Sequence, residues 1–386
     1  MSIESILLRA WTDRLPLLRS GEVTACRLFH GAGDGIEGLV IELFENVLIV
    51  QTHPGHGRVH DSFGGPAQSG SSEPEAQARV LMWDRLPAGQ SDRQDAGPTH
   101  PRLRFGLGKN APIASRTCHG LPGDERLRPA IERLRQEVGA RAVYRKIFVP
   151  DRAEVPAEVT AMHASPQPWI GESVEPEILV REHGVAFITR PYDGFSVGLF
   201  LEHRENRQRV RALAAGRRVL NLFSYTCSFS VAAAAGGAAH VSSVDVSKRY
   251  LEWGKRNFEV NGLSTASHLF FCSDVLEFYA RARRQRRRYD LVILDPPTFA
   301  RLRRPRRTFV LDERLPALAA GAIELLDSGG TLLLATNNRQ IGRDRLEGDL
   351  LAAVGDRGLT ILDRPPLPPD FPGDPEYSKT IMANLE

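Results

Sequence analysis

The stretch YDLVILDPPTF, residues 289–299, decides the fold. Its four consecutive apolar residues, 291–294, predict a strand buried on both faces, as parallel sheets require. Pro296 and Pro297 cannot donate to a sheet ladder, so the strand ends before them and Asp295 lies at its carboxyl end. Open α/β sheets bind their ligands at that edge. The stretch predicts a functional site at Asp295; a strand that merely ends in a proline-rich turn is the alternative.

The C-terminal half of the chain predicts an α/β fold. From Arg217 onward, apolar strand-like runs alternate with helical patterns, which is typical of a parallel doubly wound sheet. Seven strands are predicted, at residues 219–222, 241–245, 269–272, 291–295, 331–336, 360–362 and 379–383.

The sequence of the N-terminal half predicts a second, smaller structural unit. Residues 1–20 contain an amphipathic helix at 4–19. Residues 21–190 alternate strands with a helix that has Pro129 in its first turn, which favours a compact α+β module. This module lacks a recognisable catalytic cluster, so we expect it to dock the substrate. The glycine-rich turn at 31–38 precedes a strand rather than a helix, and we interpret it as a strand connection without a phosphate site.

Residues 54–116 differ in composition from their surroundings. They are rich in Gly, Ser, Pro, Gln and Asp, which predicts a flexible insertion in the α+β module. His53, His56 and His60 could bind a metal ion, but histidines of a flexible loop are the better interpretation, and we expect no metal site.

The net charge and the number of cysteines limit the classes of protein to which this chain can belong. The chain has 386 residues, a net charge of +3 and only four cysteines, without a CxxC pair, which disfavours zinc sites and disulfides and favours a reducing cytoplasm. A signal-peptide apolar region and an uncharged run of about 20 residues are both missing, so we expect a soluble, cytoplasmic protein and no membrane contact.

Eleven arginines lie between residues 281 and 307, in the runs RARRQRRR (281–288) and RLRRPRR (301–307). The two runs bracket Asp295. A charge run is often only a solvated surface, but its position on both sides of one candidate site favours contact with a nucleic-acid backbone. Arg301, Arg303 and Arg304 are therefore predicted to bind the substrate.

Acidic residues follow three successive predicted strands. They are Asp245, Asp274 and Asp295. A single Asp at such a position is commonly a helix cap or a turn residue. Three of them at neighbouring strand ends favour a cofactor site instead.

Four segments in order resemble one family: GLFLEHRENR (198–207), NLFSYTCSFSVAAAAGGA (221–238), SVDVSKRYLEWGKRNFEVNGL (243–263) and LDPPTF (294–299). They resemble the class I methyltransferases of the RlmI and RlmK type, which use S-adenosyl-L-methionine (SAM) to modify large-subunit ribosomal RNA. The segment at 26–51 is similar to the α+β module in front of the RlmI catalytic domain. The resemblance implies a Rossmann-like seven-stranded methyltransferase domain at 191–386, with SAM as its cofactor and ribosomal RNA as its partner.

The resemblance also implies roles for individual residues. The loop after the first strand would hold the amino-acid end of SAM, Asp245 its ribose and Asp274 its adenine. Glu202, His203 and Arg204 could close over SAM or contact RNA phosphate, with Arg204 assigned to the cofactor, unless their segment is simply the start of a helix. The loop residues expected to bind the cofactor are Asn221, Phe223, Tyr225 and Cys227.

Two features of this sequence differ from the pattern of the family. That group usually begins with a PUA domain, whereas only about 20 residues precede the module here, so we expect that domain to be absent. The family loop YTGGFS reads YTCSFS here, with Cys227 and Ser228 in place of the glycines. A positive φ would cost either residue roughly 1 kcal/mol or more, which could weaken SAM binding.

The sequence favours a guanine nitrogen as the methylated atom. Methylation of cytosine C5 requires a cysteine thiolate, and no cysteine follows Cys272. Asn337 and Asn338 instead resemble the guanine-methylating relatives, although a polar strand-end turn is the alternative. Asp295 and the Pro296 carbonyl would accept the base hydrogens while Phe299 stacks on a flipped base. The rival functions are a cytosine-C5 methyltransferase with a cysteine from elsewhere and a catalytically weak RNA-binding assembly factor.

Overall fold

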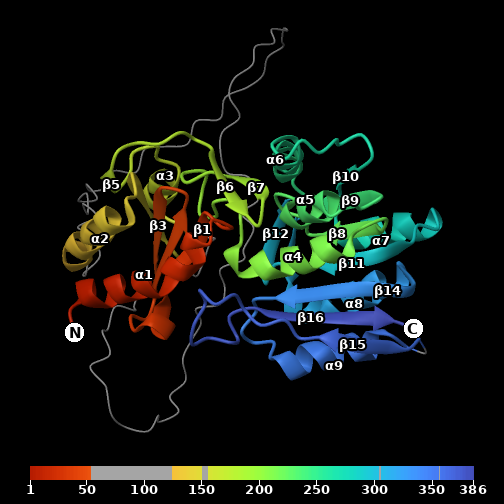
Figure 1. Cartoon of the computed structure of the whole chain (residues 1–386). Helices are drawn as coiled ribbons and strands as arrows, with labels where there is room; N and C mark the ends of the chain where they lie inside the picture. Colours follow the sequence, from red (N-terminus) through yellow and green to blue (C-terminus); the bar gives the residue numbers. More distant parts are fainter. Residues whose placement is uncertain (54–123, 150–154, 304–305, 356) are drawn as a thin grey trace, which may run out of the picture.

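The computed structural model describes residues 1–53, 124–149, 155–303, 306–355 and 357–386, and only the backbone at 124–126, 299–303 and 306–309 (Figure 1). The insertion expected at 54–116 lies outside the described residues. Among those that are described, no helix combines the length and apolar character that a membrane crossing requires.

The C-terminal half forms a seven-stranded sheet in the order β10-β9-β8-β11-β14-β16-β15. The first five strands in this order run parallel, and β16 is antiparallel to both its neighbours. All seven predicted strands are present, but the last one runs opposite to the parallel arrangement we expected. The strands are β8 (Arg218–Leu222), β9 (His240–Asp245), β10 (Leu269–Cys272), β11 (Tyr289–Leu294), β14 (Leu326–Thr336), β15 (Leu359–Asp363) and β16 (Lys379–Leu385).

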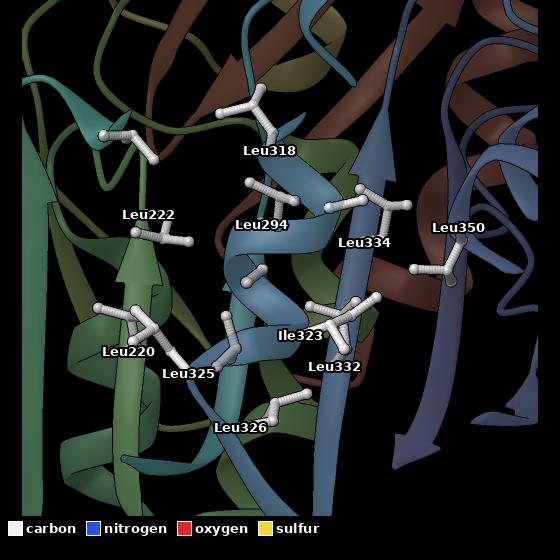
Figure 2. Close-up of a cluster of buried hydrophobic side chains, with 14 of the residues drawn as sticks. Leu220, Leu222, Leu294, Leu318, Ile323, Leu325, Leu326, Leu332, Leu334 and Leu350 are labelled. Atoms are coloured by element: carbon white, nitrogen blue, oxygen red, sulfur yellow. The ribbon is translucent and has the colours of Figure 1, made fainter. Parts of the chain in front are cut away.

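The central strand β11 is buried on both faces, as its sequence predicts. Val292 and Leu294 belong to one core, with α7 (Val275–Arg284), α8 (Leu311–Glu324) and α9 (Arg343–Ala353). Leu291 and Ile293 belong to the core on the other face, with α4 (Arg204–Leu213) and α5 (Ser228–Ala235). Figure 2 shows the first core, where side chains of α8 meet those of β8, β11 and β14.

The N-terminal half forms a five-stranded sheet of β1 (Ala25–His30), β2 (Leu39–Phe44), β3 (Val47–Thr52), β4 (Ala142–Ile147) and β5 (Ile170–Gly171). Its other elements are α1 (Ile3–Arg19), α2 (Asp124–Val138), α3 (Ala157–His163) and the 3-10 turn η1 (Gly31–Asp34).

Two details of this half differ from the prediction. The N-terminal helix, α1, shares a core with α2 and the sheet through Ile6 and Leu7, so it is packed as part of the module. Pro129 lies inside α2, which begins at Asp124, whereas we expected the proline in the first turn.

The hairpin of β6 (Ile178–Glu182) and β7 (Val185–Thr189) links the two halves. It belongs to neither large sheet, but an isolated bridge between Val23 and Glu182 connects it to the front module, to which we assigned it. On its other side, Asn257 of α6 (Lys248–Glu259) and Asn261, two residues after that helix, each accept a hydrogen bond from a β7 N–H group at 2.8 Å.

A short hairpin that the sequence did not predict follows the DPPT segment. Its strands are β12 (Phe299–Arg303) and β13 (Arg306–Val310). Within the described part of the chain, Arg301 and Arg303 of the second arginine run therefore lie on β12, and Arg306 and Arg307 lie on β13.

Candidate functional site

The sheet order reverses between β8 and β11, and a pocket lies at the carboxyl ends of these two strands. Such a switch point is where doubly wound sheets bind ligands. The pocket, counted together with the open solvent in it, has an empty volume of about 430 Å³. It is lined by Phe200, His203, Arg207, Phe223, Ser224, Tyr225, Ser228, Phe229, Asp295 and Pro297.

The loop after β8 has a strained backbone. Phe223, Tyr225 and Cys227 have φ angles of 55°, 48° and 61°, and they are half of the six non-glycine residues with positive φ in the described chain. Such conformations cost on the order of 1 kcal/mol each and concentrate at functional sites. Ser228, in contrast, begins α5, so only the first of the two glycine replacements carries the expected strain.

The predicted loop residues divide into two groups. Phe223 and Tyr225 line the pocket. Asn221 instead donates to Ser230 Oγ at 2.9 Å, and the fully buried Cys227 packs on α6, where a Cβ at Gly254 would lie 2.3 Å from its sulfur. Burial raises the pKa of the Cys227 thiol to about 12, which makes it a poor nucleophile.

Asp245 holds this loop from the end of β9. Its carboxylate is buried, and its two oxygens accept hydrogen bonds from the N–H groups of Tyr225 at 2.9 Å and Ser247 at 2.8 Å. Burial raises the pKa of the carboxyl to about 7, although the two N–H groups oppose this. Each oxygen has a second lone pair for a ligand hydroxyl.

Asp274 lies beyond the neighbouring strand β10 and caps α7. Its Oδ1 accepts hydrogen bonds from the N–H groups of Leu276 and Glu277, at 2.8 and 3.3 Å. The half-buried side chain is therefore an N-cap, the alternative role that we considered for a single Asp. Its Oδ2 takes no part in these capping bonds.

The DPPT segment, which contains Asp295, is joined to Asn337 by its last residue. Thr298 Oγ1 donates to Asn337 Oδ1 at 3.1 Å, so the end of β14 is tied to the segment that contains Asp295 and Pro296. Asn338 has the alternative role of a turn residue, since its Oδ1 accepts from the Gln340 N–H at 2.9 Å. Phe299, Arg301 and Arg303 lie on β12, where only the backbone is described, and Arg304 lies outside the described residues.

Arg204 does not reach the pocket, contrary to the prediction. Its guanidinium is fully buried and forms a bidentate ion pair with Asp370, which lies in the loop between β15 and β16. The prediction failed because its partner lies 166 residues away in the sequence.

Two neighbours of Arg204 line the pocket instead. His203 Nε2 lies 3.5 Å from Asp295 Oδ2, and Arg207 makes a two-point ion pair with Glu182 at 2.7 Å. His203 belongs to the group that we expected near SAM or RNA, although only Arg204 of that group was assigned to the cofactor, and Arg207 was not predicted. His203 and Arg207 are four residues apart in the sequence. In a helix this spacing places two side chains on the same face, which could have indicated that both point the same way.

The first arginine run is only partly free for a ligand. Arg281 and Arg287 lie over the Phe271 ring, 5.0 and 5.2 Å from its centroid. Arg283 forms an ion pair with Glu324. The remaining arginines of this run, Arg284, Arg286 and Arg288, are exposed.

The pocket fits a polar ligand. Tyr225 lines it, and within the described part of the chain its buried Oη has no hydrogen-bond partner. A buried hydroxyl without a partner is unfavourable, and a polar ligand group could satisfy it. The pocket itself offers aromatic rings, the Asp295 carboxylate and this hydroxyl, whereas Asp245 and Asp274 lie at the ends of β9 and β10 and are not among the residues that line it.

Comparison with known proteins identifies the family. A family model described as S-adenosylmethionine-dependent methyltransferase matches residues 163–383, more than half of the chain. The chain belongs to this methyltransferase family. The match confirms the predicted cofactor, SAM, and includes every residue that lines the pocket.

Curated methyltransferases from several bacteria are similar to this chain. Ribosomal RNA large subunit methyltransferase K of Neisseria meningitidis is 40% identical over 176 residues, 46% of this chain and 50% of the relative. Methyltransferase K/L of Shewanella loihica is 37% identical over 206 residues, 53% of this chain and 28% of the relative. The chain thus matches half or less of the length of these relatives, and the resemblance to the large-subunit rRNA methyltransferases is confirmed.

Solved methyltransferase structures share the fold. One, complexed with SAH, has a TM-score of 0.72 at 24% identity and covers 99% of this chain and 80% of its own. Another, from Streptococcus mutans, has a TM-score of 0.71 at 23% identity and covers 100% of this chain and 82% of its own. These similarities confirm the Rossmann-like fold class.

Proposed function

We propose that this chain is a SAM-dependent RNA methyltransferase that acts on a guanine nitrogen of large-subunit ribosomal RNA. The observation that carries the proposal is the position of Asp295, which borders the switch-point pocket and is linked through Thr298 to Asn337. The relatives named as large-subunit rRNA methyltransferases support the substrate class.

Asp245 and the loop after β8 would hold the cofactor. The spare lone pairs of the Asp245 carboxylate would accept the ribose hydroxyls, and Asp274 Oδ2 would accept the adenine amine. Phe223 and Tyr225 would surround the amino-acid end, because they line the pocket. Bound SAM supplies an electrophilic methyl group.

The DPPT segment would position the base. Asp295 and the Pro296 carbonyl would accept hydrogens from a guanine, Phe299 would stack on the flipped base, and Asn337 would hold the segment in place. Guanine N7 already presents a lone pair, so alignment matters more than a general base. An exocyclic amine would need the acceptor at Asp295.

RNA binding is assigned to the arginine runs and the front half of the chain. We place an accessory module at 21–190, with the helix of 1–20 packed on it, and the catalytic domain at 191–386. Arg284, Arg286 and Arg288 would contact phosphates beside Arg301, Arg303 and Arg304. Because released counterions drive such binding, replacing these arginines would flatten its salt dependence.

Incubation with methyl-labelled SAM and unmodified rRNA, followed by digestion and chromatography of the nucleosides, tests the proposal. We expect label in a methylguanosine, and a loss of about 100-fold or more in Asp295→Ala with unchanged SAM affinity. Label in 5-methylcytidine would instead support the C5 rival. SAM binding without transfer to RNA would contradict the proposal.

A second candidate, a catalytically weak RNA-binding assembly factor, is favoured by one observation. Cys227 occupies a left-handed conformation that normally favours glycine, which raises the free energy of the loop that would hold SAM. Calorimetric titration with SAM separates the two candidates, since an assembly factor of this kind would bind RNA but show little or no heat with SAM.

A further inference from the structure

His203 contributes an imidazole edge to the pocket beside Asp295. The ring is almost fully buried, and its Nε2 lies 3.5 Å from Asp295 Oδ2. That distance is longer than a formed hydrogen bond. Catalytic contacts are commonly this long before the substrate binds and shorten in the complex.

The other ring nitrogen fixes the tautomer. Asn206 Nδ2 lies 3.0 Å from His203 Nδ1 and also donates to Thr380 Oγ1 at 2.9 Å. An amide nitrogen only donates, so in this orientation of the Asn206 amide Nδ1 accepts and has no proton. The proton of the neutral ring is therefore on Nε2, which faces the carboxylate.

The backbone under His203 is fixed by long-range contacts. The next residue, Arg204, is paired with Asp370, and Arg207, one helical turn further, is paired with Glu182. The ring itself contacts Phe229, with a centroid distance of 5.3 Å. This frame holds the imidazole in a defined position relative to Asp295.

We propose that His203 is a positioning residue, which donates its Nε2–H to Asp295 Oδ2 and so turns the other carboxylate oxygen toward the hydrogens of the target base. The inference rests on the proposed function, because Asp295 is the residue assigned there to the base. His203 itself need not touch the substrate.

Two variants separate positioning from packing. In His203→Ala the donor is lost, and we expect kcat for RNA methylation to fall about 10- to 100-fold while the SAM Kd stays within about twofold. In His203→Gln the side-chain amide can donate from nearly the same place, and we expect kcat within about fivefold of the parent. A glutamine variant as slow as the alanine variant would overturn the proposal, and so would an alanine variant with full kcat.

The tautomer gives a readout that does not depend on activity. In proton–nitrogen correlation spectra of ¹⁵N-histidine-labelled protein, the signals absent from His203→Gln identify His203. We expect the Nε2–H pattern, and a shift of that signal in Asp295→Ala. An Nδ1–H pattern, or no response to Asp295→Ala, would overturn the proposal even if no RNA substrate were found. If wild type showed the expected spectra but methylated no RNA, only the proposed function would fail.

Discussion

The buried carboxylate of Asp245 makes folding depend on pH, and its proposed ribose role extends this dependence to cofactor binding. Burial raises its pKa to about 7 from an ordinary value of 3.8. Because the folded-state pKa lies above the unfolded value, its contribution to stability is fully present below about pH 4 and is lost as the pH rises toward 7. The ionised form that prevails above pH 7 is the better acceptor for ribose hydroxyls.

We therefore expect SAM affinity to increase about tenfold between pH 6 and pH 8, in proportion to the ionised fraction of Asp245. Isothermal titration calorimetry across this range measures it. Asp245→Asn is the matched control, since it keeps the shape of the side chain and removes the titration. If Asp245→Asn showed the same increase in affinity, the pH dependence would come from titration of SAM itself, and the ribose role of Asp245 would be refuted.

Cys227 and Gly254 form a matched pair at the contact of the loop with α6. A Cβ on Gly254 would lie 2.3 Å from the Cys227 sulfur but 3.4 Å from the next nearest atom outside Cys227, the Thr226 carbonyl oxygen. The cysteine thus requires glycine at this position of α6, whereas glycine at 227 would leave room for a larger residue.

This contact predicts strong coupling between two substitutions. We expect Gly254→Ala to destabilise the parent by about 1–3 kcal/mol through overpacking, and to be nearly neutral when Cys227→Gly is also present. Urea unfolding of both single variants and the double variant measures the coupling. Additive effects would show that the loop and α6 move apart easily.

At the scale of elements, α7 depends on its N-cap Asp274. Replacing it with alanine removes the acceptor for two backbone N–H groups, and we expect a loss of about 1 kcal/mol in stability. Asp274→Ser keeps a good cap without the carboxylate. If Asp274 also holds the adenine, both variants lose SAM affinity but only the alanine variant loses stability, which thermal unfolding and calorimetry can separate. Full SAM affinity in Asp274→Ser would leave capping as its role.

At the scale of the molecule, Asp370 joins the two halves. Its Oδ2 accepts the Arg27 N–H from β1 at 2.8 Å and Arg204 Nη1 from α4 at 3.2 Å, and its carbonyl accepts Arg14 Nη2 from α1 at 3.3 Å. Two residues on, the Pro372 carbonyl oxygen lies 2.0 Å from where a Cβ of Gly33 would be. The glycine-rich turn therefore permits close approach of the C-terminal loop.

We expect Asp370→Ala to lower the free energy of unfolding by about 3–5 kcal/mol, because it leaves the buried Arg204 without its carboxylate. Arg204→Ala should act similarly, and the double variant should lose less than the sum. The control is Glu137→Ala, which breaks an exposed ion pair with Arg133 and should cost less than about 1 kcal/mol. An effect of Asp370→Ala as small as that of the control, by chemical denaturation, would refute the structural role of the ion pair.

The sequence by itself determined the seven strands and the edge of the sheet at which the site lies. Apolar runs and prolines act locally, so LVIL followed by DPP defines a buried strand and its end without any partner. The strain at Cys227 was also predictable from the sequence. The related loop has a glycine at this position, and a cysteine there pays for the positive φ that a glycine adopts freely.

Only the tertiary structure decided what the polar side chains do. Arg204 pairs with Asp370, His203 faces Asp295 and Asn338 closes a turn, although each belonged to a segment that the sequence analysis had marked as functional. Arg204 and Asp370 are 166 residues apart, and His203 and Asp295 also lie on separate elements. Whether a charged side chain forms an ion pair or binds a ligand depends on which partner the fold places beside it. The local sequence does not specify the distance between residues that are far apart in the chain.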